Sequence, residues 1–191
     1  MNPTRPGSVI QPTAPSWHHH PEDNMDYAIN GLPLHILLVH AVVVFVPITA
    51  LCTALAVLWP AARRRLGLLT PILGLFSLIV VYIAQLAGEW LLLRVGQTPA
   101  IAHHAALGLG LLPWAWALAA AAIAPWLWHR FSIGTALAAR IGTTGTKVAT
   151  ALAVLAVLFV CGAAVVEVVL IGDAGSRAVW EGVFSPTPVA R

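Results

Sequence analysis

Residues 34–59 read LHILLVHAVVVFVPITALCTALAVLW and contain no aspartate, glutamate, lysine or arginine. This segment is longer than the roughly 20 residues that a helix needs to cross the hydrocarbon core of a bilayer. Three further stretches, 66–93, 99–128 and 148–171, are also long and almost free of charge. Because a backbone in lipid has to satisfy its own hydrogen bonds, each of the four predicts a membrane-spanning helix.

The overall composition supports the same class. Hydrophobic residues make up 59% of the 191-residue chain and charged residues 9%, which leaves too little polar surface for a soluble domain. The predicted fold is all-α, an integral membrane, up-and-down four-helix bundle over residues 31–175. Residues 1–30 are rich in proline and are predicted to be a disordered external tail. Residues 176–191 are predicted to be an external C-terminal segment.

The basic residues predict the orientation of the bundle. Arg63, Arg64 and Arg65 follow the first apolar stretch, and a second basic group lies between His129 and Lys147. The positive-inside rule places both connections in the cytoplasm, so that both termini are predicted to lie outside. The net charge of +3 is therefore a topology signal, and it indicates a lipid bilayer as partner and not a nucleic acid.

Polar side chains fall into one layer below the predicted outer surface. Counted inward at about 1.5 Å per residue, one residue from each helix lies roughly 7 to 10 Å deep. These four are His40, Glu89, His104 and Glu167. Two histidines, His35 and His103, lie near the rim of this layer, and Arg94 and Asp173 lie above it. Ionisable residues inside a membrane predict a functional site by default.

The histidines favour a b-type haem site for electron transfer. The first and third helices of an up-and-down bundle are diagonal, and a histidine from each can ligate a haem iron from opposite sides. The candidate ligands are His35, His40, His103 and His104, with His40 and His104 preferred because their depths agree. Gly108, one turn below His104, would leave room for a porphyrin edge. A pairing of His35 with His103 stays open, since helix tilt changes depth.

Two other functions remain open. Imidazoles and carboxylates could instead hold zinc, iron or manganese, with His40, Glu89, His104 and Glu167 as ligands. Under the haem hypothesis the two carboxylates, with Arg94 and Asp173, would surround the ligands without binding the iron. The third possibility is a packing or assembly subunit in which the polar layer only specifies helix contacts. A redox function implies a partner protein that the sequence does not identify.

Three smaller features complete the predictions. The adjacent histidines His18, His19 and His20 in the tail are a weak candidate for metal chelation. Cys52 and Cys161 lie at different depths and are predicted to be free thiols. Gly172 is predicted to end the last helix, and the segment after it, with Asp173 and Arg177, either anchors at the surface or folds over the polar layer.

Several of these residues carry a family resemblance. The run PLHILLVH at 33–40, the pair Gly88-Glu89, the histidine at 103 or 104 and the ending IGDAGSRAVW at 171–180 are the matching motifs. Over residues 28–182 the chain resembles the uncharacterised bacterial four-helix membrane proteins called domain of unknown function 2231. The resemblance implies a bacterial inner-membrane protein with kinship to two-haem cytochrome-like bundles, and it implies no established activity.

Overall fold

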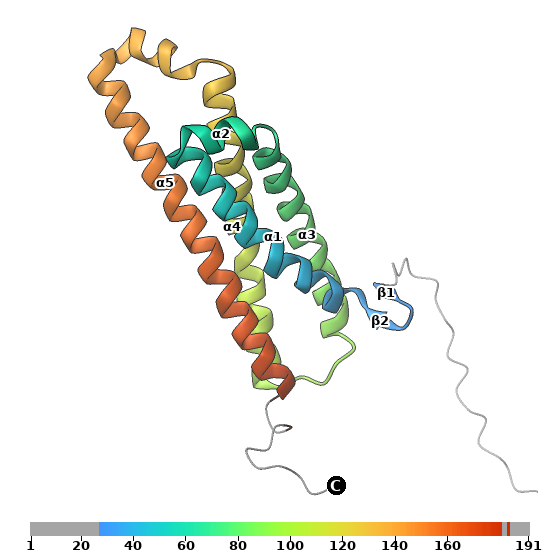
Figure 1. Ribbon diagram of the computed structural model, residues 1–191. Helices are drawn as coiled ribbons and strands as arrows, with labels where there is room; N and C mark the ends of the chain where they lie inside the picture. Colours follow the sequence, from blue (N-terminus) through green and yellow to red (C-terminus); the bar gives the residue numbers. More distant parts are fainter. Residues whose placement is uncertain (1–26, 181–182, 184–191) are drawn as a thin grey trace, which may run out of the picture.

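The computed structural model describes residues 27–180 and residue 183, and it is a bundle of long helices (Figure 1). Four of them are long and apolar enough to cross a membrane: α1 (Leu34–Leu58), α3 (Leu69–Leu92), α4 (Pro99–Arg130) and α5 (Ile133–Trp180). A short helix, α2 (Pro60–Leu66), joins α1 to α3. The prediction of an all-helical bundle with four helices that could cross a membrane is confirmed.

A small β-hairpin precedes α1. Strands β1 (Ala28–Ile29) and β2 (Leu32–Pro33) pair antiparallel around Asn30-Gly31, and both turn residues have positive φ, 50° and 78°. Asn-Gly is the dipeptide that two-residue hairpin turns prefer, because both positions need this backbone conformation. The prediction of a structureless tail up to residue 30 is therefore wrong for residues 28–30. The candidate chelating group His18–His20 lies outside the described residues.

The four long helices pack in a ring. Helix α1 packs against α3 and α5, and α4 packs against the same two helices from the other side. Helices α1 and α4 therefore face each other across the bundle. Small residues allow close approach: a Cβ added to Gly74 on α3 would lie 2.8 Å from the Cβ of Ala122 on α4. Such small-residue contacts are typical of helix packing in membranes, where close van der Waals packing takes the place of a hydrophobic driving force between helices.

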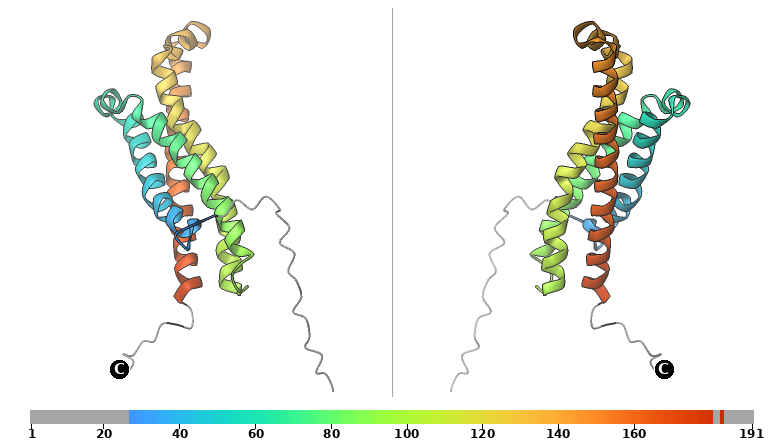
Figure 2. Two further views of the ribbon diagram at one scale, coloured as in Figure 1. Left: turned by 90° about the vertical axis from the view of Figure 1, so that its right-hand side faces the viewer. Right: turned by 90° about the vertical axis from the view of Figure 1, so that its left-hand side faces the viewer.

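Helix α5 is longer than predicted and is broken near its start. Gly142 has φ 77° and ψ 169°, so residues 133–141 run across the end of the bundle before the long part of α5 begins (Figure 1). This crossing segment lies beyond α2 in both side views (Figure 2). The helix does not end at Gly172, as predicted, but continues to Trp180. Packing explains the difference, because Ala174 is buried and Gly175 contacts the His104 ring.

Candidate functional site

Two histidines meet at one end of the bundle. His35 lies in the first turn of α1 and His104 in the second turn of α4. Their ring centroids are 6.3 Å apart and the ring planes are inclined by 73°. We call this the histidine end of the molecule, defined by His35 and His104. The two imidazoles come from α1 and α4, the helices that face each other across the bundle. The pair therefore connects opposite sides of the bundle.

Each histidine is held by a backbone carbonyl of a neighbouring helix. The His35 Nδ1–H donates to the Ala84 carbonyl oxygen on α3 at 2.8 Å, and the His104 Nδ1–H donates to that of Ile171 on α5 at 3.1 Å. A carbonyl oxygen can only accept, so in both bonds Nδ1 carries the proton. In a neutral imidazole the other nitrogen, Nε2, then keeps its lone pair. Both rings therefore present an Nε2 that can bind a metal or accept a proton.

Glycines make the space for both rings. A Cβ added to Gly88 would lie 2.9 Å from Nδ1 and 3.0 Å from Cε1 of His35. A Cβ added to Gly175 would lie 3.0 Å from Cε1 of His104. Carbon atoms in favourable contact are about 3.5 to 4.0 Å apart, so any larger residue at these positions would push against the ring. The two glycines form cradles that fit an imidazole.

His40 and His103 lie away from this pair. His40 is exposed, and its Nδ1–H donates to the Ile36 carbonyl of its own helix at 2.6 Å. Five residues along a helix rotate a side chain by about 140° from the starting direction, so His35 and His40 point to different sides. His103 is also exposed, whereas its neighbour His104 is half-buried. The structure therefore brings together His35 and His104, and not the preferred pair of His40 with His104.

The carboxylates occupy separate positions. Glu167 on α5 is half-buried and lies against the backbone of α4, where a Cβ added to Gly110 would be 2.8 Å from its Oε1. Glu89 is exposed, although it follows the glycine that holds His35. Among the residues that the structure describes, no group of three or more histidine, cysteine or acidic side chains could hold a metal ion. The predicted four-ligand set for zinc, iron or manganese is therefore not assembled.

The remaining charged candidates interact locally. Asp173 is exposed and accepts a hydrogen bond from Nε of Arg177 at 2.8 Å, one turn along α5. The Arg94 guanidinium lies 3.8 Å from the ring centroid of Trp90, also one turn away on its own segment. Exposed pairs of this kind contribute little to stability. Neither Asp173 nor Arg94 reaches the two histidine rings through these contacts.

One polar residue of the site was missed by sequence reasoning. The Gln85 side-chain Nε2–H donates to the Gly108 carbonyl at 2.8 Å and links α3 to α4. Gln85 is adjacent to Ala84, whose carbonyl holds His35, so the amide supports the same part of the bundle. An isolated amide in an apolar helix gives no spacing pattern by which it could have been found. Gly108 itself faces open space, since an added Cβ would meet no atom within 4 Å.

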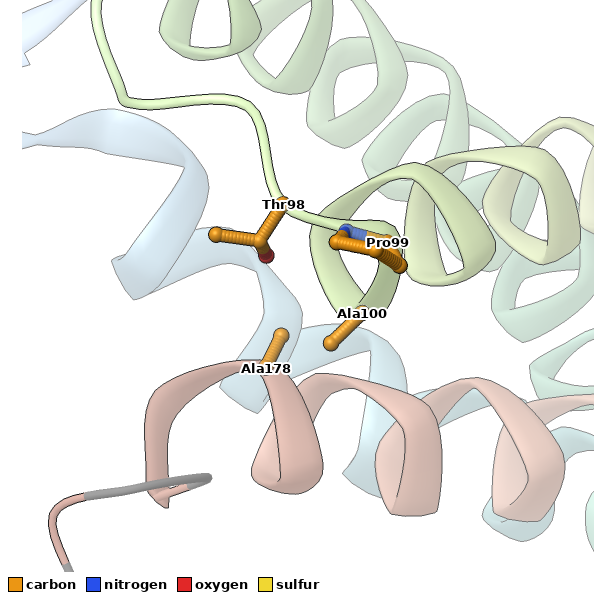
Figure 3. Close-up of a pocket in the computed structure, with 4 residues that line it drawn as sticks. All are labelled: Thr98, Pro99, Ala100 and Ala178. Carbon is orange, nitrogen blue, oxygen red and sulfur yellow. The ribbon is translucent and has the colours of Figure 1, made fainter.

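A small pocket lies between the start of α4 and the last turns of α5. Its volume is about 240 Å³, and it is lined by Thr98, Pro99, Ala100 and Ala178 (Figure 3). The Thr98 hydroxyl caps α4 by accepting a hydrogen bond from the Ile101 N–H at 3.2 Å, which confirms the predicted start of this helix. The pocket is an opening between α4 and α5. Because its lining has no titratable side chain, it offers no acid–base or metal-binding group.

Comparison with known proteins adds no further constraint. No protein-family model, no curated protein and no solved structure matches this chain. The resemblance to the family called domain of unknown function 2231 therefore stays a prediction.

Proposed function

We propose that this protein is a bacterial inner-membrane electron-transfer protein that binds one b-type haem between His35 and His104. The observation that carries the proposal is the matched pair of hydrogen bonds, which leave Nε2 available on two rings from opposite helices. Two imidazoles would have to lie close together, from different helices, to hold one metal centre between them. The observed separation of 6.3 Å is compatible with that arrangement.

The residues around the pair fit such a group. Gly88 and Gly175 allow the rings to lie close to the helix backbones, and the open space beside Gly108 lies one turn from His104. Haem supplies an iron that accepts and releases one electron. The orientation that we propose places both termini outside, so that the histidine end faces the outer surface. An electron donor or acceptor would then approach from that side.

The protein's own groups would tune the site. The Ala84 and Ile171 carbonyls fix the tautomer and the orientation of the two rings, as carbonyl partners do for metal-bound histidines. A carboxylate at Glu167 would favour the oxidised, more positive form of a nearby centre. Both rings are half-buried, so the protein would shield a bound group from part of the bulk water.

A second candidate function has its own observation. Each histidine ties two helices together, α1 to α3 through His35 and α4 to α5 through His104. Hydrogen bonds between side chains and backbone across membrane helices stabilise packing without any cofactor. The same pair could therefore serve only the assembly of the bundle. This alternative predicts a colourless protein whose stability depends on both histidines.

Spectroscopy of the purified protein separates the two functions. Protein from haem-replete cells should show a reduced-minus-oxidised spectrum of the b type, which disappears in His35→Ala and in His104→Ala. His40→Ala and His103→Ala are the matched controls, because both of these histidines are exposed, and they should keep the spectrum.

Three outcomes would contradict the haem proposal. A haem-free wild type that loses stability in the His35 and His104 variants would support the assembly function. A haem-free wild type with one equivalent of zinc, iron or manganese would support the non-haem metal site. A spectrum lost in His40→Ala and kept in His35→Ala would show that the ligand pair is a different one.

A further inference from the structure

The end opposite the histidines contains a basic cavity. We call it the arginine end, defined by Arg63, Arg64 and Arg130. A cavity of about 280 Å³ opens there between α2 and the adjoining ends of α1, α3 and α4. Its polar and aromatic lining consists of Arg63, Arg64, Thr70, Trp126, His129 and Arg130, and the other lining residues are alanine, glycine and proline. The volume is near the lower limit of about 300 Å³ for small-molecule sites.

Positive charge in this cavity has no nearby counter-charge in the described part of the chain. The carboxylates of that part are Glu89, Glu167 and Asp173. All three belong to the other half of the bundle. Glu89 follows the glycine beside His35, and Asp173 lies close to the carbonyl that holds His104. Glu167 packs on Gly110. Three arginines from α2 and α4 therefore line one cavity without a carboxylate among its lining residues.

A buried hydroxyl points to the same ligand chemistry. Thr70 lines the cavity, its side chain is only 1% exposed, and its Oγ1 has no hydrogen-bond partner among the described residues. Buried polar groups are normally paired, so an unpaired hydroxyl beside a cavity indicates a partner that the chain does not provide. A hydroxyl can donate to an anionic oxygen, and arginine forks match the geometry of phosphate. The lining thus selects an oxyanion with several acceptor oxygens.

We propose that this cavity binds the phosphate headgroup of an anionic phospholipid. The cavity lies at the ends of helices that are long and apolar enough to cross a membrane, where headgroups are found. Its lining combines arginines with Trp126 and small apolar residues, which suits a charged headgroup attached to acyl chains. Basic pockets between membrane helices bind anionic headgroups for this reason. The proposal does not depend on haem at the other end.

Thermal unfolding of the full-length protein in a neutral detergent tests the site. We expect phosphatidylglycerol or cardiolipin to raise the melting temperature, and phosphatidylcholine or inorganic phosphate to leave it unchanged. In the double variant Arg63→Gln/Arg64→Gln the apparent affinity for the anionic lipid should fall by roughly tenfold to thirtyfold. Thr70→Val keeps the side-chain volume, removes the hydroxyl and should also weaken the effect of the anionic lipid.

Arg140→Gln is the matched control for charge. Arg140 is a basic, exposed residue in the crossing segment of α5 and does not line the cavity, so this variant should bind the anionic lipid like the wild type. An equal loss of lipid affinity in Arg140→Gln would show that anionic lipid is attracted to the arginine end by its overall charge, and it would overturn the proposed site. Equal stabilisation by inorganic phosphate would identify free phosphate as the ligand and overturn the lipid proposal. A lipid effect unchanged in both cavity variants would overturn it as well.

Discussion

Replacement of Gly88 by alanine tests whether the cradle of His35 is a packing requirement. The added methyl group would lie 2.9 Å from Nδ1 and 3.0 Å from Cε1 of the His35 ring. This nitrogen donates the 2.8 Å hydrogen bond to Ala84, so the ring cannot move away from Gly88 without straining or losing that bond. The substitution therefore acts on packing and on the hydrogen bond at once.

The expected magnitude is the difference between opposing effects. Overpacking of a close contact costs about 1 to 3 kcal/mol. Loss of a hydrogen bond between membrane helices costs on average about 0.6 kcal/mol. Alanine is favoured over glycine inside a helix by about 1 kcal/mol, which opposes both costs. We expect Gly88→Ala to lower the free energy of unfolding by roughly 1 to 2 kcal/mol.

Unfolding in mixed micelles, followed by circular dichroism as denaturing detergent is added, measures the change. Gly172→Ala is the matched control, because Gly172 also lies inside a long helix and an added Cβ would meet no atom within 4 Å. This variant should be as stable as the wild type or up to about 1 kcal/mol more stable. The main difference between the two alanine variants is that the methyl group at position 88 meets the His35 ring, whereas the one at position 172 meets no atom.

A double variant isolates the cause. In a His35→Ala background the ring is absent, so Gly88→Ala should be neutral or stabilising there. The reasoning would be refuted if Gly88→Ala were as stable as Gly172→Ala, or if its cost were the same with and without the His35 ring.

Three further predictions concern other parts of the bundle. Gly74→Ala would bring a methyl group to 2.8 Å from another on α4, and we expect thermal unfolding to show a loss of about 1 to 2 kcal/mol despite the gain in helix propensity. Thr49→Val removes the hydroxyl that lies 2.8 Å from the Ser77 hydroxyl, and unfolding should show a cost of about 1 kcal/mol; an unchanged midpoint would contradict the importance of this buried bond. A periplasm-active reporter fused after Arg191 should be active and one fused after Arg65 inactive, and the reverse pattern would overturn the predicted orientation.

The approximate bounds of α1, α3 and α4 could be predicted because local chemistry determines them. The bilayer sets the length of each apolar stretch, and the Thr98-Pro99 sequence caps the start of α4 as expected. The same kind of local chemistry accounts for the hairpin, since Asn30-Gly31 is a turn signal. Gly172 was a misleading signal, because contacts with α4 keep α5 helical beyond it.

The partner of each histidine could be predicted only in part. Counting residues gives the depth of a side chain, but the face on which it lies depends on helix rotation, which changes by about 100° per residue. Depth favoured His40, whereas rotation brings His35 to the carbonyl of Ala84. Gly88 and Gly175, which lie far from their histidines in sequence, become meaningful only when four helices are packed.

The two histidine bonds divide the bundle into halves. One joins α1 to α3 and the other joins α4 to α5, so each hairpin of long helices is closed by its own imidazole. The rings then meet at 6.3 Å across the boundary between the hairpins. Each half brings one ring, one carbonyl and one glycine cradle, and the exposed connection at residues 93–98 is the covalent link from α3 to α4. The contact between the two rings therefore depends on how the two hairpins pack against each other, because each hairpin contributes one ring.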